Sequence, residues 1–184
     1  MPITTLDEKA ALIAIDLQKG IVGMQTVIPT SDVVARSAAL AKAFRKRGLP
    51  VVLVNVTAAT PGRTDEGPRK FAFPDDWAEL VPELEQQPED HLVSKQCVGA
   101  IYGTDLHEYL RGHGVTQVFV TGIATSGGVE STAREARDRG YNVVIVVDAV
   151  TDRDAETQRH CVEKLFPRIC ETGTTADVLA LIGA

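Results

Sequence analysis

The sequence predicts a doubly wound α/β fold, with helices packed on both faces of a parallel sheet. Short runs of apolar and β-branched residues recur along the chain, and most are apolar on both faces, which is typical of strands buried on both sides. Segments with helical periodicity lie between these runs, as right-handed crossovers between parallel strands require. The length of 184 residues suits one domain with its own core, so we expect a single domain over residues 1–184.

Strands and helices alternate along the chain in this prediction. Strands are expected at residues 11–17, 51–56, 91–95, 118–123 and 143–147, with a weaker candidate at 168–171. Helices are expected at residues 31–47, 104–113, 127–139, 154–165 and 174–182. Three residues are suited to be N-caps and three glycines to follow helix ends: Ser31, Thr104 and Asp154, and Gly48, Gly114 and Gly140.

Composition and charge argue against several classes of function. The net charge of −6 disfavours binding to nucleic acid or to an anionic membrane surface. No apolar run approaches the roughly 20 residues that span a bilayer, and residues 1–9 lack the pattern of a signal peptide. The cysteines Cys97, Cys161 and Cys170 show no metal-ligand spacing and are read as reduced thiols. We therefore expect a cytoplasmic protein.

Chemically useful groups follow three of the predicted strands. Asp16 ends the first strand, Lys95 ends the third, and the glycine-rich segment 122–128 joins the fourth strand to a helix. Because parallel strands end at one edge of the sheet, we expect these groups at a common ligand site. A lysine buried beside Asp16 would pair with it and could hold or move a proton. Backbone N–H groups at the strand-to-helix turn can cradle an anion or oxyanion.

This ordered set resembles the isochorismatase-like superfamily of cysteine hydrolases, and the resemblance runs through nearly the whole chain. Ile15-Asp16-Leu17-Gln18 is similar to the aspartate motif of that family. Lys95, together with Gly99-Ala100-Ile101-Tyr102-Gly103-Thr104-Asp105-Leu106, is similar to its lysine motif. Segment 121–133 is similar to the motif that carries the nucleophilic cysteine, but Gly128 stands where most members have that cysteine.

The resemblance implies a three-layer α-β-α sandwich around a Rossmann-like parallel sheet of six strands. It also implies a cis peptide between Ile123 and Ala124, with the N–H groups of Ala124 and Gly128 directed into the pocket. A homo-oligomer, either a dimer or a tetramer, that acts on a small-molecule substrate is expected on the same ground. The four histidines do not reproduce the metal-binding cluster of nicotinamidase-like members, so we expect no metal and no cofactor.

The glycine at position 128 decides which chemistry is predicted. In cysteine members the aspartate activates the thiol, and a glycine cannot supply that nucleophile. True isochorismatases also carry glycine there, and they cleave a vinyl ether without covalent catalysis. By this resemblance Asp16 is the general acid, Lys95 orients the substrate and balances charge, and the Gly128 region binds an anionic or carbonyl group. Burial must then raise the pKa of Asp16, so that its carboxyl is protonated when a small anionic substrate is bound.

Further substrate contacts are expected beside these motifs and in a long loop. Loop 58–76 is rich in proline, glycine and charge, and it could be either a binding loop or a surface excursion. Its arginines could clamp a carboxylate or be solvated, and Trp77 could stack on a planar substrate or anchor the loop to the body. The predicted substrate-binding residues are Gln18, Ala124, Thr125, Gly127, Arg63, Arg69 and Trp77.

Other functions stay open beside this prediction. The chain could be a catalytically silent binding protein on the hydrolase scaffold, or a cysteine amidase whose nucleophile has been replaced by Gly128, with Asp16 as base. A serine hydrolase using Ser126, Asp148 and His160 is disfavoured because His160 lies inside a predicted helix. The glycine spacing matches neither a P-loop nor a dinucleotide-binding fingerprint, so no nucleotide cofactor is implied.

Overall fold

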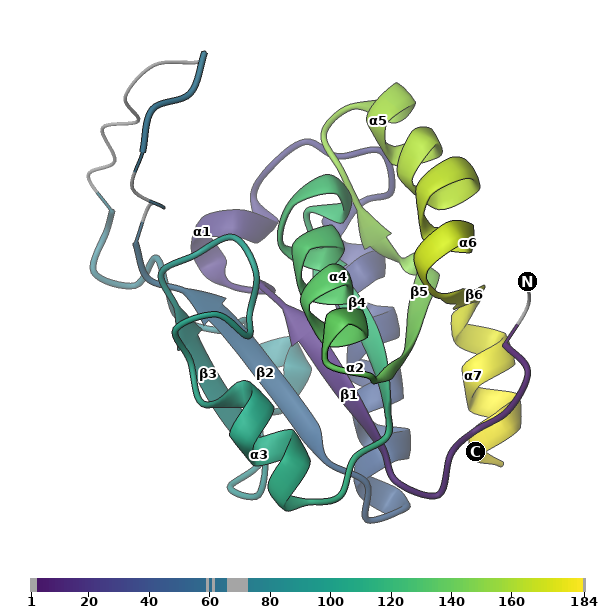
Figure 1. Cartoon of the computed structure of the whole chain (residues 1–184). Coiled ribbons are helices and arrows are strands. Elements are labelled where there is room, and N and C mark those ends of the chain that lie inside the picture. The colour runs from purple at the N-terminus through teal and green to yellow at the C-terminus, as the bar shows by residue number, and fades with distance from the viewer. Residues whose placement is uncertain (1–2, 59, 61, 66–72, 184) are drawn as a thin grey trace.

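The computed structural model of the chain describes residues 3–58, 60, 62–65 and 73–183. Its centre is a six-stranded sheet in the order β3-β2-β1-β4-β5-β6, and all neighbouring strands are parallel (Figure 1). The parallel six-stranded sheet expected from the sequence is therefore confirmed. The strands are β1 (Ala10–Ile15), β2 (Val51–Val56), β3 (His91–Lys95), β4 (Gln117–Ile123), β5 (Asn142–Thr151) and β6 (Glu171–Gly173).

Helices cover both faces of the sheet and give the fold three layers (Figure 1). One face is covered by α3 (Leu106–Gly112), α4 (Glu130–Asp138) and α6 (Phe166–Ile169). The other face is covered by α2 (Thr30–Lys46) and α7 (Thr175–Ile182). Shorter helical segments are α1 (Lys19–Val22), α5 (Ala155–His160) and a 3₁₀ turn at Pro82–Leu84.

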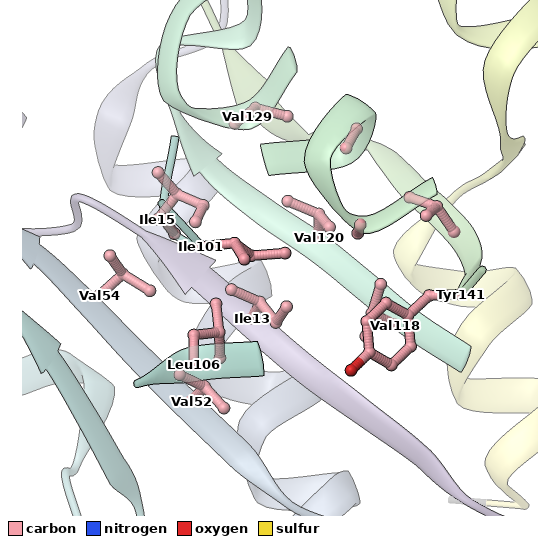
Figure 2. Packing of buried hydrophobic residues seen from close by; sticks show 14 of the residues in the cluster. Ile13, Ile15, Val52, Val54, Ile101, Leu106, Val118, Val120, Val129 and Tyr141 are labelled. Atoms are coloured by element: carbon pink, nitrogen blue, oxygen red, sulfur yellow. The ribbon is translucent and has the colours of Figure 1, made fainter. Parts of the chain in front are cut away.

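The core forms two layers because successive side chains of a strand point to opposite faces of the sheet. On β1, Ile13 and Ile15 pack toward α3 and α4, whereas Leu12 and Ala14 pack toward α2. Burying one such large aliphatic side chain contributes about 1.5–3 kcal/mol. Figure 2 shows the first layer, which includes Ile13, Ile15, Val52, Val54, Ile101, Leu106, Val118, Val120, Val129 and Tyr141.

The strand order reverses at the centre of the sheet. Strands β1, β2 and β3 progress toward one edge, and β4, β5 and β6 progress toward the other, so the connectivity reverses between β1 and β4. In a parallel α/β sheet, ligands bind at the carboxyl ends of the strands that flank such a reversal. Asp16 directly follows β1, and the glycine-rich segment directly follows β4, so the two motifs meet at this point.

Several element boundaries differ from the prediction. The last strand is Glu171–Gly173 instead of 168–171, because Arg168 belongs to α6, which tolerates Pro167 in its first turn. Strand β5 continues past 147 to Thr151, because a register shift opposite Gly122 lets its last residues pair with β4 again. The helix expected at 154–165 continues through a π-type turn at Cys161–Leu165 into α6.

The helix caps agree with the prediction only in part. Asp154 caps α5 by accepting a hydrogen bond from the Thr157 N–H at 2.8 Å. Ser31 does not cap α2, because that helix begins at Thr30 and Pro29 occupies the N-cap position. Thr104 precedes the N-cap position of α3, although its hydroxyl accepts a hydrogen bond from the Leu106 N–H. The three predicted glycines adopt the left-handed conformation after their helices: Gly48, Gly114 and Gly140.

Candidate active site

An ion pair between Asp16 and Lys95 forms the centre of the site. Lys95 Nζ lies 2.9 Å from Asp16 Oδ2, and both residues are buried. Lys95 ends β3, the edge strand, and its side chain reaches the end of β1 across the intervening strand β2. Lys95 Nζ also donates to the carbonyl oxygens of Val98 at 2.8 Å and Cys97 at 3.3 Å. These three acceptors match the three N–H donors of an ammonium group, so the charge of Lys95 is fully hydrogen-bonded.

Burial raises the pKa of the Asp16 carboxyl to about 6, although the ammonium of Lys95 opposes the shift. Desolvation of the Asp16 carboxyl thus outweighs its pairing with Lys95. Asp16 Oδ1 is buried and has no hydrogen-bond partner among the described residues. An unpartnered buried carboxylate oxygen is costly, and protonation lowers that cost. Asp16 is therefore an acid that can exchange a proton near neutral pH.

Gly128 lies against this ion pair. A Cβ atom built on Gly128 would be 3.2 Å from Asp16 Oδ2 and 3.4 Å from Lys95 Nζ. The same atom would be 2.9 Å from the Cγ2 methyl of Ile15, a contact closer than real Cβ atoms accept. A side chain at position 128 would therefore point at both charged groups, but the surrounding packing fits a glycine.

The glycine turn, Thr125–Val129, connects β4 to α4 and carries Gly128. A cis peptide bond joins Ile123 to Ala124 just before the turn, as the resemblance implied. Inside the turn, Gly127 departs from helical geometry with φ −113° and ψ −109°. Thr125 is fully buried, and its hydroxyl has no hydrogen-bond partner among the described residues.

Asp152 holds the glycine turn from the end of β5, and the sequence reasoning missed it. Its Oδ2 atom accepts hydrogen bonds from the backbone N–H and the hydroxyl of Ser126, both at 2.7 Å. The predicted strand at 143–147 ends four residues too early, so the aspartate that follows it in the sequence is Asp148 instead of Asp152. Asp148 accepts hydrogen bonds from the N–H and hydroxyl of Thr175 and pairs with Arg36, so it fastens α7 and α2.

Two residues of α4 hold the loop after Lys95, and these were also missed. The Thr132 hydroxyl accepts a hydrogen bond from the Ala100 N–H at 3.0 Å. The carboxylate of Glu135 accepts one from the Ile101 N–H at 2.9 Å. A Cβ on Gly99 would be 2.6 Å from the Glu135 carboxylate, so any larger residue there would displace the end of the Glu135 side chain. The helix that follows the glycine turn thus also fixes the segment whose carbonyls bind Lys95.

Gln18 and Trp77 connect the long loop to the body of the protein. The Gln18 amide accepts from the Val56 N–H and donates to the carbonyl oxygens of Val56 and Trp77. Trp77 packs on Gly20 and lies against Phe73, with ring centroids 4.0 Å apart. These contacts favour the anchoring role for Trp77, and they leave the Gln18 amide engaged by the backbone.

The remaining predicted substrate contacts are placed as follows. Ala124 is half-buried beside the glycine turn, and Gly127 lies within it. Arg63 is exposed, whereas Arg69 lies outside the described residues. Contact of any of these residues with a substrate stays a prediction.

The serine-hydrolase alternative finds no triad in this geometry. The Ser126 hydroxyl donates to Asp152, Asp148 is engaged by Thr175, and His160 lies exposed in α5. Within the described ranges there is also no group of three or more His, Cys, Asp or Glu side chains that could hold a metal ion. In the same part of the chain no helix is long and apolar enough to cross a membrane.

The fold and the site together define a three-layer α/β protein with a buried acid–lysine pair at the reversal point of its sheet. The isochorismatase domain model matches residues 10–177. The chain belongs to the isochorismatase family and is a hydrolase of that family.

Three similar proteins illustrate the range of the family. The uncharacterized isochorismatase family protein YwoC of Bacillus subtilis is 39% identical over 179 residues, covering 94% of this chain and 93% of its own. An isochorismatase family protein from Burkholderia thailandensis, whose structure is solved, is 43% identical in sequence to this chain. The two structures superpose with a TM-score of 0.94, and the match covers 98% of each chain. Maleamate amidohydrolase of Pseudomonas putida is 29% identical over 159 residues, covering 80% of this chain and 75% of its own.

Proposed function

We propose that this protein hydrolyses a small anionic vinyl ether of the isochorismate type by acid catalysis from Asp16, without a covalent nucleophile. The observation that carries the proposal is the pairing of a raised pKa at Asp16 with a glycine at the neighbouring position 128. A carboxyl group with a pKa of about 6 can be a general acid near neutral pH. A glycine has no group that could attack the substrate, so water must be the nucleophile.

The reaction would proceed in three steps. Protonated Asp16 gives its proton to the terminal carbon of the vinyl ether, which forms an oxocarbenium ion and leaves Asp16 as a carboxylate. Water adds to the oxocarbenium carbon and returns one proton to Asp16, so the acid is regenerated. The resulting hemiketal then collapses to a ketone and an alcohol, which for isochorismate are pyruvate and a dihydroxylated cyclohexadiene acid.

Lys95 and the glycine turn would support this reaction in different ways. After proton transfer, the carboxylate of Asp16 is stabilised by the ammonium of Lys95 at 2.9 Å. Because Lys95 already donates to three oxygens, charge balance suits it better than a direct bond to a substrate carboxylate. The N–H groups of Ala124 and Gly128 are the candidate donors to the anionic end of the substrate, because those of Ser126, Gly127 and Val129 already bond within the protein.

Turnover of isochorismate by the wild-type chain and by Asp16→Ala tests the proposal. Formation of pyruvate is followed by a coupled assay. We expect turnover by the wild-type chain and a loss of at least about 100-fold in Asp16→Ala, which is the usual size of a general-acid contribution. A wild-type chain that is silent, or an Asp16→Ala variant that keeps full activity, contradicts the proposal.

The second candidate is a cysteine amidase scaffold whose nucleophile is missing, because the similar protein from Pseudomonas putida is a maleamate amidohydrolase. Under this candidate the wild-type chain should not turn over isochorismate, and the same is expected of a binding protein without catalysis. An assay of Gly128→Cys on maleamate separates the amidase scaffold from the vinyl-ether hydrolase. Because Ile15 crowds position 128, the variant should be made with and without Ile15→Ala. Amide hydrolysis by either variant, together with silence of the wild-type chain on isochorismate, favours the second candidate.

A further inference from the structure

Asp152 is a buried acidic residue that the proposed reaction does not use. It follows Thr151, the last residue of β5, and only 7% of its surface is exposed. Its carboxylate accepts three hydrogen bonds: two at Oδ2 from Ser126 and one at Oδ1 from the Arg153 N–H at 2.8 Å. Hydrogen bonds to an ionised acceptor are about twice as strong as those between neutral groups. Asp152 is therefore a strong local restraint on Ser126.

The glycine turn needs such a restraint. Gly127 and Gly128 have no side chains that could pack and hold the turn, and glycine loses more conformational entropy on ordering than any other residue. Backbone hydrogen bonds from the N–H groups of Gly127 and Val129 converge on the Ala124 carbonyl at 3.0 and 3.2 Å. The side chain of Ser126 links the same turn to the sheet through Asp152.

Asp152 is itself fixed from the opposite side. Its carbonyl oxygen accepts a hydrogen bond from the Val27 N–H at 2.8 Å. The hydroxyl of the preceding Thr151 bonds to both the N–H and the carbonyl of Ile28, each at 2.9 Å. Thr151 also pairs with Ile123 of β4, directly before the turn. The end of β5 thus holds the Asp152 carboxylate in place, and the carboxylate in turn fixes the position of Ser126.

We propose that Asp152 is a positioning residue that acts through Ser126 to press the glycine turn against the Asp16–Lys95 pair. Gly128 lies two residues after Ser126, and the atom built on it approaches Asp16 and Lys95 to 3.2 and 3.4 Å. The turn therefore forms one wall of the site and excludes water from Asp16. The proposal rests on the proposed function in one respect, because it takes Asp16 as the reacting group.

Titration of Asp16 in labelled protein, followed by carbon-13 NMR of its carboxyl, tests this positioning role without any substrate. Loosening the turn admits water to Asp16, and hydration lowers a pKa that burial has raised. Lys95 is the charged group that faces Asp16, and it is unchanged in every variant. We expect Asp152→Asn to lower the titration midpoint of Asp16 by about 1 unit.

Two further variants separate positioning from the loss of a negative charge. Ser126→Ala removes one of the two bonds to Asp152, changes no charge and alters only an exposed side chain, so we expect the fold to be kept. It should lower the midpoint in the same direction, and Ser126→Thr, which keeps a hydroxyl, should restore it. Asp154→Asn is the matched control: it removes the charge of an exposed aspartate two residues further on, whose carboxylate accepts from the Thr157 N–H in α5 and not from Ser126. The midpoint should not move in this control.

An unchanged midpoint in both Asp152→Asn and Ser126→Ala overturns the positioning role, and so does an equal shift in Asp154→Asn. If the wild-type chain turns over isochorismate, Asp152→Asn should also reduce kcat about tenfold or more with little change in KM. A displaced glycine turn is expected to slow the chemical step more than it weakens substrate binding. If the midpoints shift but the wild-type chain is silent on isochorismate, the positioning role stands and the proposed reaction fails.

Discussion

At the scale of single residues, the site depends on a balance between desolvation and charge pairing at Asp16. Burial favours the neutral acid, and Lys95 at 2.9 Å favours the carboxylate. Because the pKa is raised to about 6 despite the lysine, desolvation is the larger effect. Asp16 can therefore gain and lose a proton near pH 6, and it is not always the ionised partner of Lys95.

This raised pKa makes stability depend on pH. The folded state binds the proton of Asp16 more tightly than the unfolded state, so the contribution of Asp16 to stability is full below the ordinary aspartate pKa of 3.8 and is lost as pH rises through about 6. The loss amounts to about 3 kcal/mol. Asn mimics the protonated acid, so the unfolding free energy of Asp16→Asn minus that of the wild type should rise by most of this amount, about 2 kcal/mol, between pH 4 and pH 7. Urea unfolding at each pH measures this difference in unfolding free energy. A difference that stays constant with pH would contradict the raised pKa of Asp16.

Replacing Lys95 tests the opposing effect. Lys95→Met removes the ammonium that lowers the pKa of Asp16 and keeps most of the side-chain volume, so the titration midpoint should rise further above about 6. Lys19→Met is the matched control, because Lys19 pairs with Asp76 and Glu79 at the surface. Carbon-13 NMR of Asp16 should show the shift in the first variant alone. An Asp16 titration midpoint that does not rise in Lys95→Met would show that the lysine does not lower the pKa of Asp16.

At the scale of elements, the glycine turn and its neighbours set the shape of the site. The expected strand ends at Asp16 and Lys95, and the expected strand-to-helix turn after β4, all occur in the structure. The end of β1 could be predicted because this buried strand is apolar on both faces, so Asp16, the first polar residue after it, marks its end. The contacts of Asp152 with Ser126 could not be predicted, because they depend on the register shift that extends β5 to Thr151.

The packing around Gly128 leads to a prediction for Gly128→Ala. The added methyl group would be 2.9 Å from Ile15 Cγ2 on a buried strand, so we expect a loss of about 1–3 kcal/mol in stability. The gain from a stiffer unfolded chain, about 0.4–1 kcal/mol, is smaller. Gly112→Ala in α3 meets no atom within 4 Å and should be neutral or stabilising. Urea unfolding of both variants checks this, and equal stability of the two would show that position 128 has room for a side chain.

The helix caps give a second prediction at this scale. Thr174 and Asp177 form a reciprocal capping box at the start of α7, whereas Ser31 makes no capping bond in α2. Thr174→Ala should therefore cost about 1 kcal/mol of stability. Ser31→Ala should change stability by less than about 0.5 kcal/mol. Thermal unfolding of the two variants is sufficient, and an equal loss in both would contradict the assignment of the caps.

At the scale of the whole molecule, the fold could be predicted further than the site. Alternation of apolar runs and helical periodicity gave the class of fold, and the strand order then brought Asp16 and the glycine turn together at the reversal between β1 and β4. The reach of Lys95 across β2 and the use of all its donors depend on side-chain geometry that no sequence pattern encodes. A single domain, a dimer or tetramer, and a cytoplasmic location stay predictions.

Whether Asp16 acts as acid or as base is decided by the pH dependence of kcat/KM for isochorismate, recorded beside the NMR titration of the Asp16 carboxyl. Acid catalysis requires the protonated form, so kcat/KM should fall about tenfold for each pH unit above the Asp16 pKa. The kinetic midpoint and the NMR midpoint should coincide near pH 6. A rate that instead rises with pH through this range would show that the carboxylate is the active form, and acid catalysis by Asp16 would be wrong.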